Sequence, residues 1–332
     1  MKNKIIVIGD LHLKNKQPYM KYQQKFLDWL LDEYSSDTDR IDMIFLGDIY
    51  DNSSPHWTIV DMFHQFLIER SNNSNNRSNI FILNGNHDTS RIKGCSLLPF
   101  NNIPNVIAID DKIEINIKGL KCLFLPHKHN YKEYAELENK VDYIFSHVMT
   151  EKRQFANEGV SFENLHGCFI YGHDHMQGDF MDKNGNNHFI LGVPYETRHL
   201  ECQKHRILEI NIQEGEFSSD VLNRVTSIKE IDVPQFFTHE TIIYGEFPEN
   251  KDNILNIIDA PSRKAVYEKY ADYYIRPSGI KLLQTELTIE DHNKEFTHSS
   301  LLKRFNQFVK EFNVSKEVAE LCSSKIISCI GE

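Results

Sequence analysis

Short apolar runs rich in β-branched and aromatic residues recur through the first two thirds of the chain. None of them shows the strict alternation of a half-exposed strand, so they are typical of strands buried on both faces. The runs are IIVI, MIFL, IFIL, CLFL, YIF and FIY, at residues 5–8, 43–46, 80–83, 122–125, 143–145 and 169–171.

Amphipathic segments separate the first of these runs. In residues 22–34, Phe26, Leu27, Leu30 and Leu31 form one apolar stripe at helical spacing, and residues 58–69 form a similar segment after Pro55. Strand and helix therefore alternate, which predicts a layered α/β architecture.

The pattern changes near residue 182. Residues 182–194 resemble a hairpin, and residues 205–217 alternate toward a turn at Gly215. Before this, the asparagine-rich residues 71–79 have nothing to bury and indicate a surface loop.

A second, smaller α/β domain is expected to follow. It would contain a strand at residues 241–247, a helix around 252–260 and a strand at 280–287, before two terminal helices. The predicted domains are residues 1–227, a small α/β cap at 228–295, and a C-terminal helical segment at 296–332.

Composition narrows the class of protein. The 332 residues carry a formal charge of -11, which argues against a protein that holds nucleic acid mainly through a general positive field. The six cysteines form no CxxC pair, so neither a thiolate zinc site nor a disulfide framework is expected. Without a long apolar run, we expect a cytoplasmic protein with no membrane contact.

Polar residues follow five of the apolar runs where each strand is predicted to end. If the strands are parallel neighbours, these residues gather along one edge of the sheet, where open α/β sheets bind ligands. The side chains concerned are Asp10, His12, Asp48, Asp51, Asn86, His87, His147, His173 and His175.

The donor groups in this set are carboxylate, imidazole and amide. They suit manganese, iron or zinc better than calcium. Because residues two apart in an extended chain point the same way, Asp10 with His12, and His173 with His175, are expected to converge. A single Asp or His after a strand is usually a turn residue, so the prediction of a metal site rests on the whole set. His127 and His129 follow another strand, where a turn or supporting role fits them best.

The motif order D-x-H, G-D-x-x-D, G-N-H-D, H and G-H-x-H, over roughly residues 5–200, resembles the calcineurin-like metallophosphoesterases. The resemblance implies a β-sandwich flanked by helices and a two-metal centre that hydrolyses phosphate esters. It also implies two ligand sets that share Asp48: Asp10, His12 and His175 complete the first, and Asn86, His147 and His173 complete the second.

Two further residues take catalytic roles from the same resemblance. His87 would contact the phosphate and help the leaving oxygen depart, rather than bind metal. The Asp51 carboxylate would hold that imidazole in one tautomer. Asp88 is expected to support the loop.

Within the superfamily, the chain is most similar to the SbcD-type nucleases, including the short forms of T-even phages. Residues 47–58 and 192–199 carry this similarity, although Val193 stands where those nucleases have Ser or Thr. Protein phosphatases instead read G-D-x-x-D-R-G and G-N-H-E, whereas Asn52 follows Asp51 here and Asp88 ends the second motif.

This similarity implies a 3′–5′ DNA exonuclease and single-strand endonuclease in recombination or double-strand-break repair. It would use two divalent cations, Mn²⁺ or else Mg²⁺, and work with an SbcC-like SMC-type ATPase docked on the terminal helices. Those helices could equally close a small core of their own. A homodimer is a further candidate assembly. Candidate DNA contacts, which are otherwise ordinary solvated charges, are Lys14, Lys16, Arg91, Lys93 and Arg198.

Two other functions remain open from the sequence. One is a phosphomonoesterase or nucleotide phosphodiesterase of the same superfamily, because the metal ligands alone do not choose the substrate. The other is a metal-free scaffold that uses the fold only to bind partners.

Overall fold

A six-stranded, mostly parallel sheet contains the first three predicted strands. In the order β14-β13-β1-β2-β3-β6, β13 runs antiparallel to both of its neighbours and the other pairs are parallel. The strands are β1 (Asn3–Ile8), β2 (Arg40–Phe45), β3 (Ile80–Leu83), β6 (Val106–Ile109), β13 (Arg206–Glu214) and β14 (Arg224–Asp232). The computed structural model describes residues 3–17, 19–35, 39–73, 78–90, 94–128, 130–148, 150, 159–195, 205–214, 224–236, 239–248 and 254–283.

A second six-stranded sheet contains the other three predicted strands. Its order is β11-β12-β10-β9-β8-β7, in which the middle four strands are parallel and the two outer strands are antiparallel to their neighbours. The strands are β7 (Ile113–Ile117), β8 (Leu120–Leu125), β9 (Asn139–Ser146), β10 (Leu165–Tyr171), β11 (Gly178–Met181) and β12 (Asn187–Ile190). A short hairpin, β4 (Thr89–Ser90) with β5 (Gly94–Cys95), lies outside both sheets.

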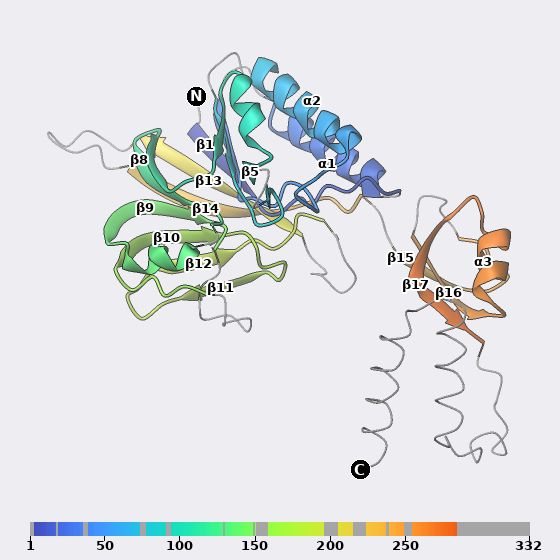
Figure 1. Cartoon of the computed structure of the whole chain (residues 1–332). Helices are drawn as coiled ribbons and strands as arrows, with labels where there is room; N and C mark the ends of the chain where they lie inside the picture. Colours follow the sequence, from blue (N-terminus) through green and yellow to red (C-terminus); the bar gives the residue numbers. More distant parts are fainter. Residues whose placement is uncertain are drawn as a thin grey trace, which may run out of the picture. The chain divides into compact units, whose positions relative to one another are not determined.

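Alternate residues of β1 enter two different cores. Ile5 and Val7 pack in the core that also contains Phe124 and Phe145 of the second sheet. Ile6 and Ile8 pack with side chains of α1 (Tyr19–Glu33) and α2 (Trp57–Asn73), which cover the other face of the first sheet (Figure 1). The expectation of strands buried on both faces is therefore confirmed, as is the β-sandwich flanked by helices.

The outer face of the second sheet has its own cover. Tyr134, from the 3₁₀ helix η2 (Tyr131–Glu136), packs there with Leu125, Ile144 and Phe169. A second 3₁₀ helix, η1 (Leu98–Asn102), precedes β6.

The arrangement of the strands corrects one expectation. A single sheet edge was predicted for all five polar clusters, but the strands before them belong to two sheets, β1, β2 and β3 in one and β9 and β10 in the other. The clusters still meet, because the carboxyl ends of both sets of parallel strands lie at the same end of the sandwich, as the side-chain contacts below show.

The chain divides into two compact units, Met1–Thr238 and His239–Glu332. The boundary predicted after residue 227 falls inside β14, which pairs with β13 along its length and so belongs to the first unit. The predicted hairpin is present, with β11 and β12 on either side of residues 182–186.

The second unit contains a three-stranded parallel sheet in the order β15-β16-β17, with strands β15 (His239–Ile243), β16 (Ile254–Ala260) and β17 (Tyr274–Leu282). The helix predicted around residues 252–260 is wrong: that segment is β16, the central strand. Among the described residues of this unit, the helix is α3 (Arg263–Lys269), and the Ala265 N–H in its first turn donates to the Ser262 hydroxyl at 3.1 Å.

The two predicted terminal helices lie outside the described residues. No helix in the described part of the chain is long and apolar enough to cross a membrane.

Candidate metal centre

The first ligand group consists of Asp10 and His12, after β1, and His175, after β10. Their ligand atoms lie within 4.8 Å of one another. The Nε2 atoms of His12 and His175 are 2.8 Å apart, and Asp10 and His12 are fully buried. Two segments that lie 163 residues apart in the sequence thus contribute to one small cluster of donors.

The second group consists of Asp48, Asn86, His147 and His173. Asn86 Oδ1 lies 3.1 Å from His147 Nε2 and 2.8 Å from His173 Nδ1, and His147 Nε2 lies 3.3 Å from Asp48 Oδ1. Neighbouring ligand atoms around one cation at about 2.1 Å are roughly 3 Å apart, so these spacings suit a shared ion.

Asp48 lies between the two groups. Its Oδ1 faces His147, while its Oδ2 lies 3.6 Å from His12 Nε2. One oxygen of the carboxylate is therefore directed to each group, as a bridging ligand requires.

Three of these residues have backbone conformations that are rare outside glycine. The φ angles of His12, Asp48 and His173 are 45°, 47° and 72°. The paired ligands were expected to converge because the chain around them is extended. That reason is wrong, because each pair includes a residue with a left-handed backbone conformation, His12 or His173. Such strained conformations concentrate at functional sites.

Glycines beside the ligands leave room for ligands from other loops. A Cβ on Gly85 would lie 2.1 Å from Asp48 Oδ1, and a Cβ on Gly172 would lie 2.5 Å from Asp10 Oδ1. The glycines thus permit close approach between loops.

The loops are further tied by Asp88. Its buried carboxylate accepts hydrogen bonds from the backbone N–H groups of Ile49, Tyr50 and Gly85. It therefore joins the loop after β2 to the loop after β3, which confirms the expected supporting role.

His87 lies at the rim of the centre, with Nε2 4.0 Å from Asp48 Oδ2. Its Nδ1 donates to the backbone carbonyl of Asp51 at 2.8 Å. The Asp51 carboxylate instead lies 3.2 Å from Lys14 Nζ. The expectation that this carboxylate orients His87 is therefore wrong, because the main chain of the same residue accepts the hydrogen bond.

Burial dominates the electrostatics of the ligands. It lowers the pKa of His12 to about 2 and that of His173 to about 3, and it raises the pKa of Asp10 to about 7. Burial also opposes the charge on His147, but Asp48 and Asp10 outweigh it and raise the His147 pKa to about 10. His12 and His173 are thus neutral and ready to act as ligands, whereas His147 holds a proton that a cation must displace.

The donor set fits divalent cations. Within the described part of the chain, the buried Asp10 Oδ1 and His12 Nδ1 atoms have no hydrogen-bond partner. An unsatisfied buried carboxylate oxygen is unfavourable unless an ion or proton compensates it. The residues present could therefore hold two cations that share Asp48.

The remaining predicted residues differ in their distance from the centre and in their exposure. Lys14 is partly buried and paired with Asp51, and Lys16 is exposed. His127 lies near the second group, its ring centroid 6.5 Å from that of His173. His129, Arg91, Lys93 and Arg198 lie outside the described residues.

Two buried residues that hydrogen-bond to the backbone of residues 11–14 carry no signal in the sequence. Gln23, on α1, and Tyr195, after β12, both bind backbone atoms beside His12. Neither belongs to a motif, and only the apolar face of α1 hints that Gln23 is buried.

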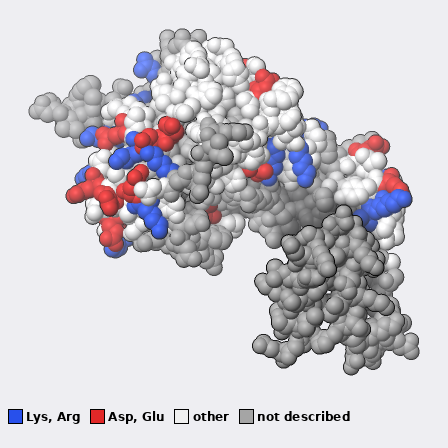
Figure 2. All heavy atoms as spheres, in the orientation of Figure 1, with Lys and Arg blue, Asp and Glu red and all other residues white. Residues whose placement is uncertain are grey.

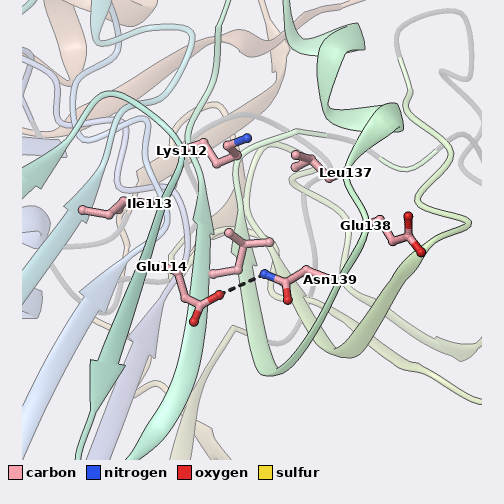
Figure 3. A pocket seen from close by; sticks show the side chains of 7 residues that line it. Lys112, Ile113, Glu114, Leu137, Glu138 and Asn139 are labelled. Carbon is pink, nitrogen blue, oxygen red and sulfur yellow. Dashed lines mark hydrogen bonds between the residues drawn. The ribbon is translucent and has the colours of Figure 1, made fainter.

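A pocket of about 230 Å³ lies elsewhere, between β7 and the start of β9 (Figure 3). None of its lining residues belongs to the ligand groups, and Asn139 donates to Glu114 across it at 2.9 Å. The chemistry of the first unit is therefore assigned to the metal centre.

Comparison with known proteins gives three findings. Among curated proteins, none matches the chain. A single mutant of Vps29 from Entamoeba histolytica is similar in structure, at 14% identity and a TM-score of 0.30, covering 69% of this chain and 98% of that chain. A dimetal phosphatase from Danio rerio is similar at 12% identity and a TM-score of 0.39, with the same coverage of 69% and 98%.

The family model for the calcineurin-like phosphoesterases matches residues 3–179, a span that begins in β1 and passes through both ligand groups to the start of β11. The chain therefore belongs to the calcineurin-like phosphoesterase family, whose members are metal-dependent phosphoesterases.

Proposed function

We propose that this phosphoesterase hydrolyses phosphodiester bonds in DNA with two Mn²⁺ ions, or Mg²⁺ in their place. The observation that carries the choice of a diester is the scarcity of fixed positive charge around the metal ligands within the part of the chain that the structure describes. Lys14, the described cation beside the centre, is neutralised by Asp51. Arg70 donates to the carbonyls of Tyr34 and Ile41, and Arg206 pairs with Asp179 and Glu230.

This charge balance matters because a phosphomonoester carries close to two negative charges near neutral pH. Sites for such dianions usually add arginine, which binds phosphate oxygens in a bidentate manner. A diester carries one charge, which two cations and a histidine can balance. The same argument disfavours a protein phosphatase.

The chemistry follows from the two groups and His87. When bound, two divalent cations supply a nucleophile from water near neutral pH and neutralise charge on the phosphoryl oxygens. His87 is placed to protonate the leaving oxygen through Nε2 when its ring is doubly protonated, because Nδ1 keeps its own proton in the hydrogen bond to the Asp51 carbonyl.

The mixed surface charge suits a nuclease whose affinity for DNA comes largely from a partner protein. On the face shown in Figure 2, the described lysines and arginines of the first unit alternate with aspartates and glutamates. We infer that an SMC-type ATPase partner supplies much of the affinity for DNA, and that the second unit directs DNA toward the metals. Copurification of the two proteins, with stimulation of cleavage by ATP, tests this part separately.

The central experiment uses the purified chain with Mn²⁺. It compares linear duplex DNA, single-stranded DNA, nucleotides and p-nitrophenyl phosphate as substrates. Cleavage of DNA, abolished by a chelator and restored by Mn²⁺, is the expected result. Rapid turnover of the monoester with intact DNA would replace the proposal with a phosphomonoesterase. Failure to bind any metal would indicate a scaffold.

A further inference from the structure

His12 is a ligand in a strained conformation, and its surroundings must hold it there. With a φ of 45° and no glycine at that position, the backbone would relax unless neighbouring groups opposed it. Backbone pairing supplies part of the restraint, because the His12 N–H donates to the Asp48 carbonyl at 2.9 Å.

Gln23 restrains the other side of His12. Its Nε2 donates to the His12 carbonyl at 3.2 Å, and its Oε1 accepts from the Lys14 N–H at 3.1 Å. The side chain is 1% exposed, so no water can replace either bond. The Gln23 amide thus binds on both sides of Leu13 and fixes the two peptide units that follow His12.

Tyr195 restrains the residue before His12. Its hydroxyl donates to the Leu11 carbonyl, and its ring packs against Phe26 of α1, at 5.3 Å between centroids. Leu11 lies between two ligands of the first group, Asp10 and His12. The Leu11 carbonyl, before His12, and the carbonyl of His12 itself are therefore both held by buried side chains.

We propose that Gln23 and Tyr195 are positioning residues for the first cation, acting through the backbone of Leu11 and His12. The hydrogen bonds from both side chains end on the backbone of residues 11–14, which carries a ligand of the first group, so the two cations should respond differently to their loss. This inference concerns metal binding and does not depend on which phosphoester is the substrate.

The test replaces each side chain by one of similar shape. Gln23→Met removes both hydrogen bonds, and Tyr195→Phe removes only the hydroxyl. Partners that orient metal ligands typically contribute about 10- to 100-fold to metal affinity. We expect a loss of that size for the first Mn²⁺ in each variant, measured by calorimetry, with the second Mn²⁺ unchanged.

Electron paramagnetic resonance supplies a readout that general destabilisation would not change. Two Mn²⁺ ions sharing Asp48 give an exchange-coupled spectrum, whereas a protein holding one ion gives the hyperfine pattern of isolated Mn²⁺. With two equivalents of Mn²⁺ at a concentration that fills both sites of the wild type, either variant should give the isolated pattern where the wild type gives the coupled one.

Matched controls separate positioning from stability. Gln24→Met changes the adjacent glutamine, which is exposed and bonds only to Asp28 at 2.8 Å. Tyr270→Phe removes a buried hydroxyl in the second unit, where it donates to the Glu246 carbonyl at 2.9 Å. Both controls should keep two cations at wild-type affinity.

Two results would overturn the proposal: wild-type affinity for both cations in Tyr195→Phe and Gln23→Met, or equal weakening of both cations in a folded variant. If Gln23→Met fails to fold, Tyr195→Phe decides the matter, since it removes a single oxygen.

Discussion

The Nδ1 atom of His87 lies 2.8 Å from the backbone carbonyl oxygen of Asp51, a residue whose own carboxylate lies beside Lys14. A carbonyl can only accept a hydrogen bond, so Nδ1 carries a proton and Nε2 is left to face the metal centre. The main chain, rather than a side chain, therefore orients the ring and holds the Nδ1 proton, and Nε2 donates to the leaving group from the doubly protonated form of His87.

Replacing His87 should abolish hydrolysis without emptying the metal centre. In His87→Asn, we expect kcat to fall by about 10²- to 10⁴-fold, the usual contribution of a general acid. Both cations should remain, because each assigned group keeps all of its ligands; His87 lies within 4.8 Å of ligand atoms of His12 and Asp48 but is assigned to the leaving oxygen. Steady-state kinetics and metal analysis check this, with the exposed His56→Asn as a control that keeps activity. Substantial hydrolysis by His87→Asn would remove the assigned role.

Replacing the Asp51 carboxylate should have a much smaller effect. In Asp51→Asn the backbone carbonyl still accepts from His87, so we expect kcat to stay within about 10-fold of wild type. The pH dependence of kcat should keep its shape. If Asp51→Asn loses as much activity as His87→Asn, the carboxylate acts directly on the imidazole after all.

A methyl group at Gly85 should disrupt the bridging ligand. The added Cβ would lie 2.1 Å from Asp48 Oδ1, so the carboxylate must move. We expect Gly85→Ala to lower the affinity for both cations by at least about 100-fold, because Asp48 serves both. Calorimetric titration with Mn²⁺ measures this.

Gly185→Ala is the matched control for that change. Gly185 has a positive φ, of 82°, whereas Gly85 does not, and a Cβ on Gly185 meets nothing within 4 Å. Backbone strain should lower the free energy of unfolding by about 1–2 kcal/mol while metal binding is preserved. A comparable loss of metal in this variant would show that a destabilising change far from the ligands is enough to empty the centre, so contact with Asp48 would not explain Gly85→Ala.

Metal binding should release a proton and strengthen as the pH rises. Asp48 and Asp10, against the effect of burial, raise the pKa of His147 from 6.5 to about 10, and its Nδ1 is committed to the Leu46 carbonyl at 2.7 Å. The proton that a cation displaces is therefore on Nε2. Affinity should rise by about 10-fold per pH unit between pH 7 and pH 10, for the proton released from His147, and more steeply below pH 7, where Asp10 also holds a proton.

Calorimetry in buffers of different ionisation enthalpy counts that proton. The metal-free protein should show the opposite trend. A pKa raised on folding stabilises the folded state below the unfolded value of 6.5, and this contribution is lost as the pH approaches 10. A metal affinity that is constant between pH 6 and pH 8, in conditions where the protein is folded, would contradict the protonated state of His147.

The sequence determined the strands and the donor groups of this protein. Runs such as residues 5–8 and 80–83 are apolar at every position. A continuous apolar run is what a strand buried on both faces requires. The residues after each run then supply Asp, Asn and His in an order that specifies the family. Both signals are local in the sequence, so they can be recognised without knowing which strands are neighbours.

The tertiary structure decided how those pieces are arranged. Whether β9 and β10 join the sheet of β1 or form a second one depends on partners far along the chain, as does the choice of strand over helix for residues 254–260. The left-handed conformation of His12 and the acceptor for His87 are likewise invisible in the sequence. Each depends on backbone N–H and carbonyl groups, which every residue carries alike, so only packing decides which of them meet.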